Sequence, residues 1–223
     1  MEPGALALTI AAVGAAYVLV RLVLRGRLSR SLSGAMAEGD YDRYRKVLFS
    51  RLTDLLVDRD DLCLLRAASL ASEGRCREAE TYLALVRREK LDAAHLMEYY
   101  RTAFSAAVQE KDPGRAAKVQ SGLKELYRTS RSPAVREQFE DNRIDIQLYI
   151  QSDSAVAGEI ARRMEGQTGV RRGVSCLALA KAHHLGSEDG KARQCLLEAR
   201  ELLTGTAYLP TIDAALADIK HLD

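Results

Sequence analysis

A recurring pattern of small residues constrains the fold of this chain more than any other feature of its sequence. Alanines recur at intervals of 35 to 41 residues, and each follows a break in the apolar pattern and begins a stretch of helical spacing. These alanines are Ala79, Ala116, Ala157 and Ala192. Such a period predicts stacked helix–turn–helix units, because one hairpin cannot bury its apolar face without its neighbours.

The apolar residues after each alanine keep to one face of a helix. A large residue lies four positions after the alanine, and a small or apolar residue lies three positions further on. The two clearest copies are Ala192-Leu196-Ala199 and Ala79-Leu83-Val86. This arrangement resembles the tetratricopeptide repeat (TPR) family over about residues 34 to 204. The chain has no Trp and lacks the Leu-Gly pair that the family places in its first helix.

The resemblance implies a concave inner surface that binds a peptide or protein segment. The first helix of each pair would line this groove. The polar residues that the alignment places there are Arg101, Asn142, Lys181 and His184. These are the partner-binding residues that we predict.

The composition favours an all-α protein, since aromatic residues are sparse and Pro occurs only four times. We predict an α-solenoid of TPR-like hairpins over residues 28–209, with a helix starting at Ser132-Pro133. A C-terminal capping helix is expected over residues 210–223, because Pro210 precedes an apolar face. An irregular helical bundle is the alternative.

The N-terminal sequence predicts a membrane anchor over residues 1–27. Residues 5–24 form an apolar run in which Arg21 is the only charged residue, and about twenty such residues match the hydrocarbon thickness of a bilayer. A cleaved signal peptide would need basic residues before the run, where the only charged side chain is Glu2. A buried helix of a soluble protein would need a polar face, which the run lacks.

The residues that flank the apolar run predict its orientation. Arginines cluster on its C-terminal side, at Arg21, Arg25, Arg27 and Arg30. Basic residues favour the cytoplasmic side, so we expect a single-pass protein of the cell membrane with the N-terminus outside and the C-terminal domain in the cytoplasm. The same four side chains can contact anionic headgroups.

The sequence offers no motif of known catalytic chemistry. Phosphate-binding loops, dinucleotide-binding glycines, nucleophile elbows and His-Glu-x-x-His pairs are all absent. The four cysteines lie far apart, and we expect reduced, buried thiols and no metal or cofactor. His183-His184 is read as an imidazole pair at a helix end, and Asp60-Asp61 as a helix cap. A net charge of +2 does not indicate a nucleic-acid partner.

These observations favour a membrane-anchored adaptor that binds a protein partner through a cytoplasmic helical solenoid, and not an enzyme. In plan the chain resembles bacterial inner-membrane adaptors that join a short anchor to TPR units, although it lacks the Cys-x-x-Cys pairs of those acting in lipopolysaccharide assembly. One alternative is a lipid- or small-molecule-handling protein, or an accessory subunit of a membrane enzyme. Another is a structural homo-oligomer joined by its anchor helices.

Overall fold

A computed structural model describes residues 20–35, 38, 40–206 and 208–222 of the chain. Every regular element among these residues is a helix, which confirms the all-α prediction. The chain divides into two compact units, Met1–Thr102 and Ala103–Asp223, and the division falls inside helix α6 (Ala93–Gln109). The predicted repeat region, residues 28–209, therefore includes parts of both units. Each unit is described by itself.

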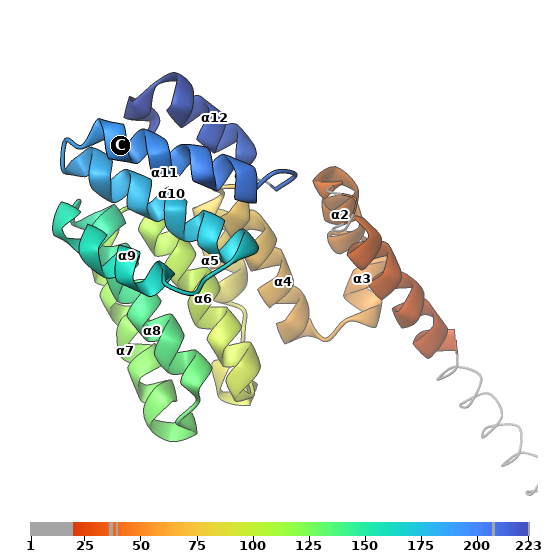
Figure 1. Cartoon of the computed structure of the whole chain (residues 1–223). Coiled ribbons are helices and arrows are strands. Elements are labelled where there is room, and N and C mark those ends of the chain that lie inside the picture. The colour runs from red at the N-terminus through yellow and green to blue at the C-terminus, as the bar shows by residue number, and fades with distance from the viewer. Residues whose placement is uncertain (1–19, 36–37, 39, 207, 223) are drawn as a thin grey trace, which may run out of the picture. The chain divides into compact units, whose positions relative to one another are not determined.

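Unit 1 consists of short helices that follow one another closely (Figure 1). A helix over residues 20–35 comes first. It is followed by α2 (Tyr41–Leu48), α3 (Arg51–Leu56), α4 (Arg59–Ser72), α5 (Cys76–Leu83), the 3-10 helix η1 (Arg88–Lys90) and the first part of α6. Helix α4 packs against α2, α3 and α5. The hairpin α4–α5 carries the predicted copy Ala79-Leu83-Val86, and all three of these residues are buried.

Side-chain caps explain why these helices are short. Asp40 accepts a hydrogen bond from the backbone of Arg43 at the start of α2, over 2.9 Å. Ser50 Oγ accepts from the backbone of Thr53 at the start of α3, over 3.4 Å. A cap satisfies a backbone donor that a new helix leaves open. The Ser50 cap separates α2 from α3, and our sequence analysis did not predict this break.

A buried ion pair joins the start of α4 to the segment after α5. Asp60 is only 5% exposed and accepts hydrogen bonds from Arg87 Nε and Nη2 over 3.0 and 2.7 Å, and from the Arg87 backbone over 3.1 Å. These bonds, the side-chain bond first, lower the pKa of the Asp60 carboxyl. Reading Asp60 merely as a helix cap was wrong, since its carboxylate connects two segments of unit 1.

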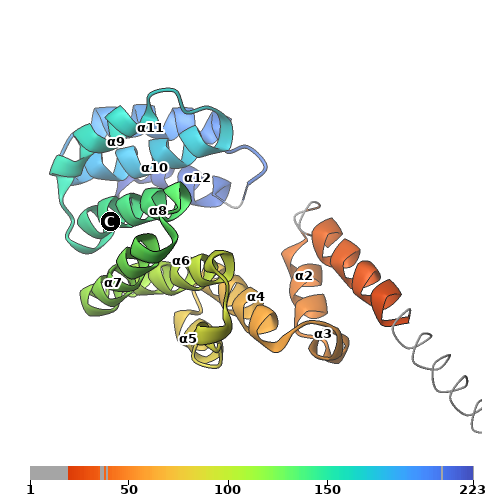
Figure 2. The ribbon, with the colours of Figure 1, turned by 90° about the horizontal axis from the view of Figure 1, so that it is seen from below.

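Unit 2 contains helical hairpins. Its elements after α6 are α7 (Pro113–Ser130), α8 (Pro133–Asp145), the π-helix η2 (Ile146–Ile150), the 3-10 helix η3 (Ser154–Val156), α9 (Ala157–Met164), α10 (Gly169–Leu185), α11 (Asp189–Leu202), α12 (Leu209–Ala217) and the 3-10 helix η4 (Ile219–Leu222). Helices α7 and α8 form one hairpin, and α10 and α11 form another. Helices α10 and α11 lie side by side, and α12 packs against α11 (Figures 1 and 2).

The core of unit 2 is built on the predicted face of α11. Ala192, Leu196, Ala199 and Leu203 are all fully buried. Alanine at two of these positions lets the backbones of α10 and α11 come close, while the leucines fill the space between the helices. Burying one leucine contributes roughly 1.5 to 3 kcal/mol to the free energy of unfolding.

The C-terminal segment differs in detail from its prediction. Helix α12 starts at Leu209 with Pro210 in its first turn, and it buries Ile212 completely. It ends at Ala217, and Ile219 belongs to the separate helix η4. The expected single capping helix over residues 210–223 is thus two short helices within the described residues.

The predicted membrane anchor lies largely outside the described residues. Only residues 20–24 of its apolar run are described, and they are helical. Among the helices of the described part, none is both long enough and apolar enough to span a bilayer.

A glycine at the α10–α11 contact provides a test of this packing. A Cβ atom at Gly173 would lie 2.7 Å from Leu203 Cγ and 3.0 Å from Leu202 Cβ. Since Leu203 is fully buried and cannot move aside, we expect Gly173→Ala to lower the free energy of unfolding by about 1 to 3 kcal/mol. Urea denaturation followed by circular dichroism measures this change.

The matched control is Gly190→Ala in the first turn of α11. A Cβ at Gly190 would meet no atom within 4 Å, so the substitution should leave stability unchanged or raise it by up to about 1 kcal/mol. Equal effects of the two substitutions would contradict the close packing at Gly173.

Candidate partner-binding surface

Helix α7 has one buried face and one exposed face. Its buried residues are Ala116, Val119, Leu123 and Leu126. They recur three or four positions apart, so they form one side of the helix. Leu126 is buried on this side, whereas the next residue, Tyr127, is half-buried. Helix α7 packs against α8.

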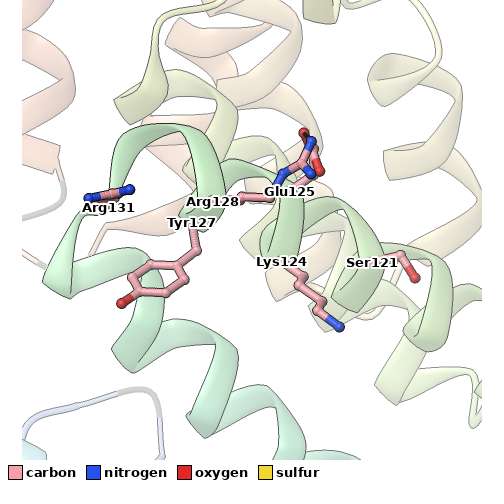
Figure 3. A pocket seen from close by; sticks show the side chains of 6 residues that line it. All are labelled: Ser121, Lys124, Glu125, Tyr127, Arg128 and Arg131. Atoms are coloured by element: carbon pink, nitrogen blue, oxygen red, sulfur yellow. Dashed lines mark hydrogen bonds and ion pairs between the residues drawn. The ribbon is translucent and has the colours of Figure 1, made fainter.

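The exposed side of α7 forms a shallow, basic hollow, which we call the α7 stripe. Its lining residues are Ser121, Lys124, Glu125, Tyr127, Arg128 and Arg131 (Figure 3). The hollow has a volume of about 720 Å³. In Figure 3 the side chains of Lys124 and Tyr127 both extend below the helix but diverge, Tyr127 to the left and Lys124 to the right, while Arg128 and Glu125 point toward each other.

The α7 stripe has more cations than anions. Arg128 Nη2 donates to Glu125 Oε1 over 2.9 Å, and this exposed pair contributes little to stability. Lys124 and Arg131 make no ion pair with any residue that the structure describes. Two positive charges are therefore available in the hollow that Tyr127 also lines. Such a surface suits a segment that carries carboxylates and an apolar or aromatic side chain.

The end of α7 fixes the position of Arg131. This residue adopts the left-handed conformation, with φ 49° and ψ 25°, and its backbone N–H donates to the Tyr127 carbonyl over 2.7 Å. A left-handed cap closes the helix, at a cost of about 1 to 2 kcal/mol for a residue with a Cβ. Helix α8 then begins at Pro133, as the Ser132-Pro133 pair predicts. Arg131 is thus placed at the turn that ends the stripe.

The four predicted partner-binding residues are divided between the two units, and two of them are buried. Arg101 lies in unit 1 on α6 and pairs with Glu98 over 3.1 Å. His184 lies in unit 2 near the end of α10, with its Nδ1 atom 2.8 Å from Asp189 Oδ1. The neighbouring His183 Nδ1 lies 2.6 Å from Glu188 Oε2. The two histidines thus join the end of α10 to the start of α11.

Asn142 and Lys181 are buried inside unit 2 and not placed on an open groove. Asn142 is fully buried and accepts a hydrogen bond from Gln138 Nε2 over 2.7 Å, whereas its own Nδ2 has no hydrogen-bond partner among the described residues. Lys181 is 9% exposed, donates to the Leu222 carbonyl and lies 5.7 Å from the ring centroid of Tyr149. Both residues therefore contact their own unit, which corrects their expected placement as surface donors.

Burial also perturbs two groups that sequence reasoning missed. Burial and, to a smaller extent, the nearby Asp141 raise the pKa of Asp145 to about 7, while Arg163 partly opposes the shift. Burial likewise raises the pKa of Tyr149, with Asp145 as a smaller cause. Tyr149 belongs to the π-helix η2, in which Gln151 N–H donates to the Ile146 carbonyl five residues earlier, over 3.0 Å. The sequence signal that could have indicated the burial of Asp145 was its position between two apolar residues, Ile144 and Ile146.

The arginines of the basic flank lie on the helix over residues 20–35 and are all exposed. Arg25 Nε donates to the carbonyl of Leu56 at the end of α3, over 2.6 Å. Arg30 Nε donates to the Gly26 carbonyl within its own helix, over 3.2 Å. Arg25 is therefore the residue of this flank that ties the first helix to α3.

The described part of the chain gives no indication of a metal centre. No group of three or more His, Cys, Asp or Glu side chains within it is arranged to hold an ion. Cys63, Cys76 and Cys176 are buried free thiols, and Cys195 is a half-buried one. Burial raises the pKa of Cys176 to about 12, so its reactive thiolate is scarce at neutral pH.

Comparison with protein-family models, curated proteins and solved structures gives no match for this chain.

Asp145 makes the stability of unit 2 depend on pH. Its carboxyl ionises near pH 3.8 in the unfolded chain but only near pH 7 in the folded one, so stability falls as the pH rises between these values. We expect Asp145→Asn to remove this fall. The variant should match the wild type near pH 4 and exceed its unfolding free energy above pH 7, by at most about 4 kcal/mol.

Urea denaturation at a series of pH values measures the difference. Glu201→Gln is the control, since Glu201 is an exposed carboxylate of α11 that makes no ion pair within the described residues. A gain for Asp145→Asn that does not change with pH would show that the carboxyl ionises normally in the folded state.

Proposed function

We propose that the chain is a single-span membrane adaptor that recruits an acidic protein segment through the α7 stripe. The observation that carries this proposal is the pair of available cations, Lys124 and Arg131, which line the same hollow as Tyr127 on the exposed side of α7. Carboxylates of a partner would pair with the two cations, and an apolar or aromatic side chain would pack on the ring. Because the contacts are exposed and charged, binding should weaken as salt rises.

The apolar run at residues 5–24 supports the membrane part of the proposal. In the proposed topology the N-terminus lies outside the cell and the helical units lie in the cytoplasm, since basic residues favour the cytoplasmic side and Arg21, Arg25, Arg27 and Arg30 cluster at the C-terminal end of the run. The hairpins α4–α5 and α10–α11 support TPR-like units as the scaffold, because their small residues occupy the buried positions that the repeat pattern assigns.

A second function is favoured by one observation in unit 1. A hollow of about 300 Å³ is lined by Val57, Asp61, Leu64, Leu65, Ala68, His95 and Glu98. Its size is at the lower end of ligand-binding cavities, and its wall is mostly apolar with three polar groups. This hollow suits a small apolar molecule with a basic or hydroxyl group, as expected of a small-molecule-handling protein.

Charge reversal in the α7 stripe tests the adaptor. A partner protein should copurify with the wild-type chain from detergent-solubilised membranes. We expect the amount of this partner that copurifies with the double variant Lys124→Glu and Arg131→Glu to be at least tenfold lower. The loss follows because two attractive contacts become repulsive. Quantitative mass spectrometry of the copurified proteins measures it, and the same partner should elute from the wild type as salt is raised.

The control variant is Arg162→Glu and Lys220→Glu, which changes the net charge of unit 2 equally at exposed positions of α9 and η4. This variant should keep the partner. Loss of the partner from both variants would indicate a nonspecific charge effect, and retention by both would reject the α7 stripe. Release of the wild-type chain from membranes by carbonate would reject the anchor.

A further inference from the structure

Helix α3 exposes two leucines on one side. Leu55 is 75% exposed and Leu52 is 47% exposed, although the helix also buries Thr53 and Leu56. Positions three apart on a helix are neighbours, so the two leucines form one apolar face. The described residues of unit 1 leave this face exposed, so it is available for contact with a partner or a lipid surface.

A hydrogen bond sets the position of α3 along the first helix of the chain. Arg25 Nε donates to the Leu56 carbonyl over 2.6 Å, and Leu56 is the last residue of α3. Arg25 directly follows Leu24, where the apolar run ends. If the run spans the hydrocarbon layer, Arg25 lies among the headgroups, and α3 is held at the same depth. The headgroup regions add about 5 to 8 Å on each side of the hydrocarbon, less than the roughly 10 to 12 Å diameter of a helix with its side chains, so a helix in this layer also reaches the acyl chains.

The charges around α3 suit an anionic bilayer surface. The arginines of the first helix and of the α3 region that make no ion pair among the described residues are Arg21, Arg25, Arg27, Arg30, Arg51 and Arg59. Two exposed acids lie in residues 51–59: Asp54, which is paired with Arg66 Nη1 over 2.9 Å, and Asp58, the N-cap of α4. The exposed arginines near α3 therefore outnumber the exposed acids beside an apolar face, the combination that binds helices to anionic lipid.

We propose that α3 lies in the headgroup layer of an anionic membrane, with Leu52 and Leu55 inserted between lipids and the surrounding arginines on lipid phosphates. The inference rests on the proposed membrane span and adds a second contact with the same bilayer. A lipid surface is favoured over a protein partner because the Arg25–Leu56 bond holds the face at the predicted exit of the span. The bilayer is then the nearest apolar phase.

The chain contains no Trp, so a single introduced Trp reports on its own surroundings. We expect Leu55→Trp, in the full-length chain reconstituted into phosphatidylcholine and phosphatidylserine vesicles, to emit at short wavelength. Lipids brominated on their acyl chains should quench this emission at least twofold. The matched control is Leu197→Trp on α11, where the leucine is 53% exposed in unit 2. Its emission should stay at the wavelength of an exposed indole and should not be quenched.

Two outcomes for Leu55→Trp would overturn the proposal. Emission at long wavelength without quenching would place α3 in water. Emission at short wavelength without bromine quenching would mean that a protein, either a second copy or another chain, covers the face. Carbonate extraction of the same vesicles separates the two hypotheses: a released chain lacks the span, whereas a retained chain with an unquenched Trp contradicts only the docking of α3.

A second pair of variants tests the role of Arg25. In the Leu55→Trp chain, Arg25→Gln removes the bond to Leu56 together with one charge, whereas Arg27→Gln removes only a charge. We expect at least a twofold larger loss of quenching for Arg25→Gln. Equal losses would contradict the positioning of α3 by Arg25.

Discussion

The close approach of α10 and α11 is the constraint on which the rest of unit 2 depends. It requires Gly173 on one helix and Ala192 and Ala199 on the other, because larger side chains would hold the backbones apart. The same contact buries Leu196 and Leu203 completely and provides the surface on which α12 packs. The α10–α11 hairpin is thus stabilised by small residues at the contact and large residues beside it.

The helical periodicity of the sequence was sufficient to predict the fold class and most buried faces, but not the ways in which helices are interrupted. The buried positions of α11 and α5 follow from the spacing of apolar residues, which any helix of this composition must bury. The break at Ser50 and the π-helix at Ile146–Ile150 depend on single hydrogen bonds that compete with the regular pattern. Ion pairs such as Asp60–Arg87 join residues far apart in sequence, and no local pattern specifies them.

The candidate site was predicted less well than the fold, for a physical reason. When the orientation of a helix in the fold is unknown, a polar side chain on it can either face solvent or be buried with hydrogen-bond partners in the core. The sequence does not distinguish these cases. Lys181 and Asn142 proved to be buried, whereas Arg101 is exposed in the other unit. The α7 stripe could have been found from its helix alone, since its exposed positions lie opposite a regular apolar face. What the sequence lacked was the left-handed turn that places Arg131 beside Tyr127.

The π-helix also has a consequence for chain length. A π-helical turn closes its hydrogen bond over one residue more than an α-helical turn, so it accommodates an additional residue inside a helix without a loop. The longest interval between the recurrent alanines, from Ala116 to Ala157, contains this segment. The π-helical turn can account for one of the residues by which this interval exceeds the others, because that residue is accommodated as a local widening of the helix. Tyr149 lies in this widened turn, with its ring centroid 5.7 Å from Lys181 Nζ.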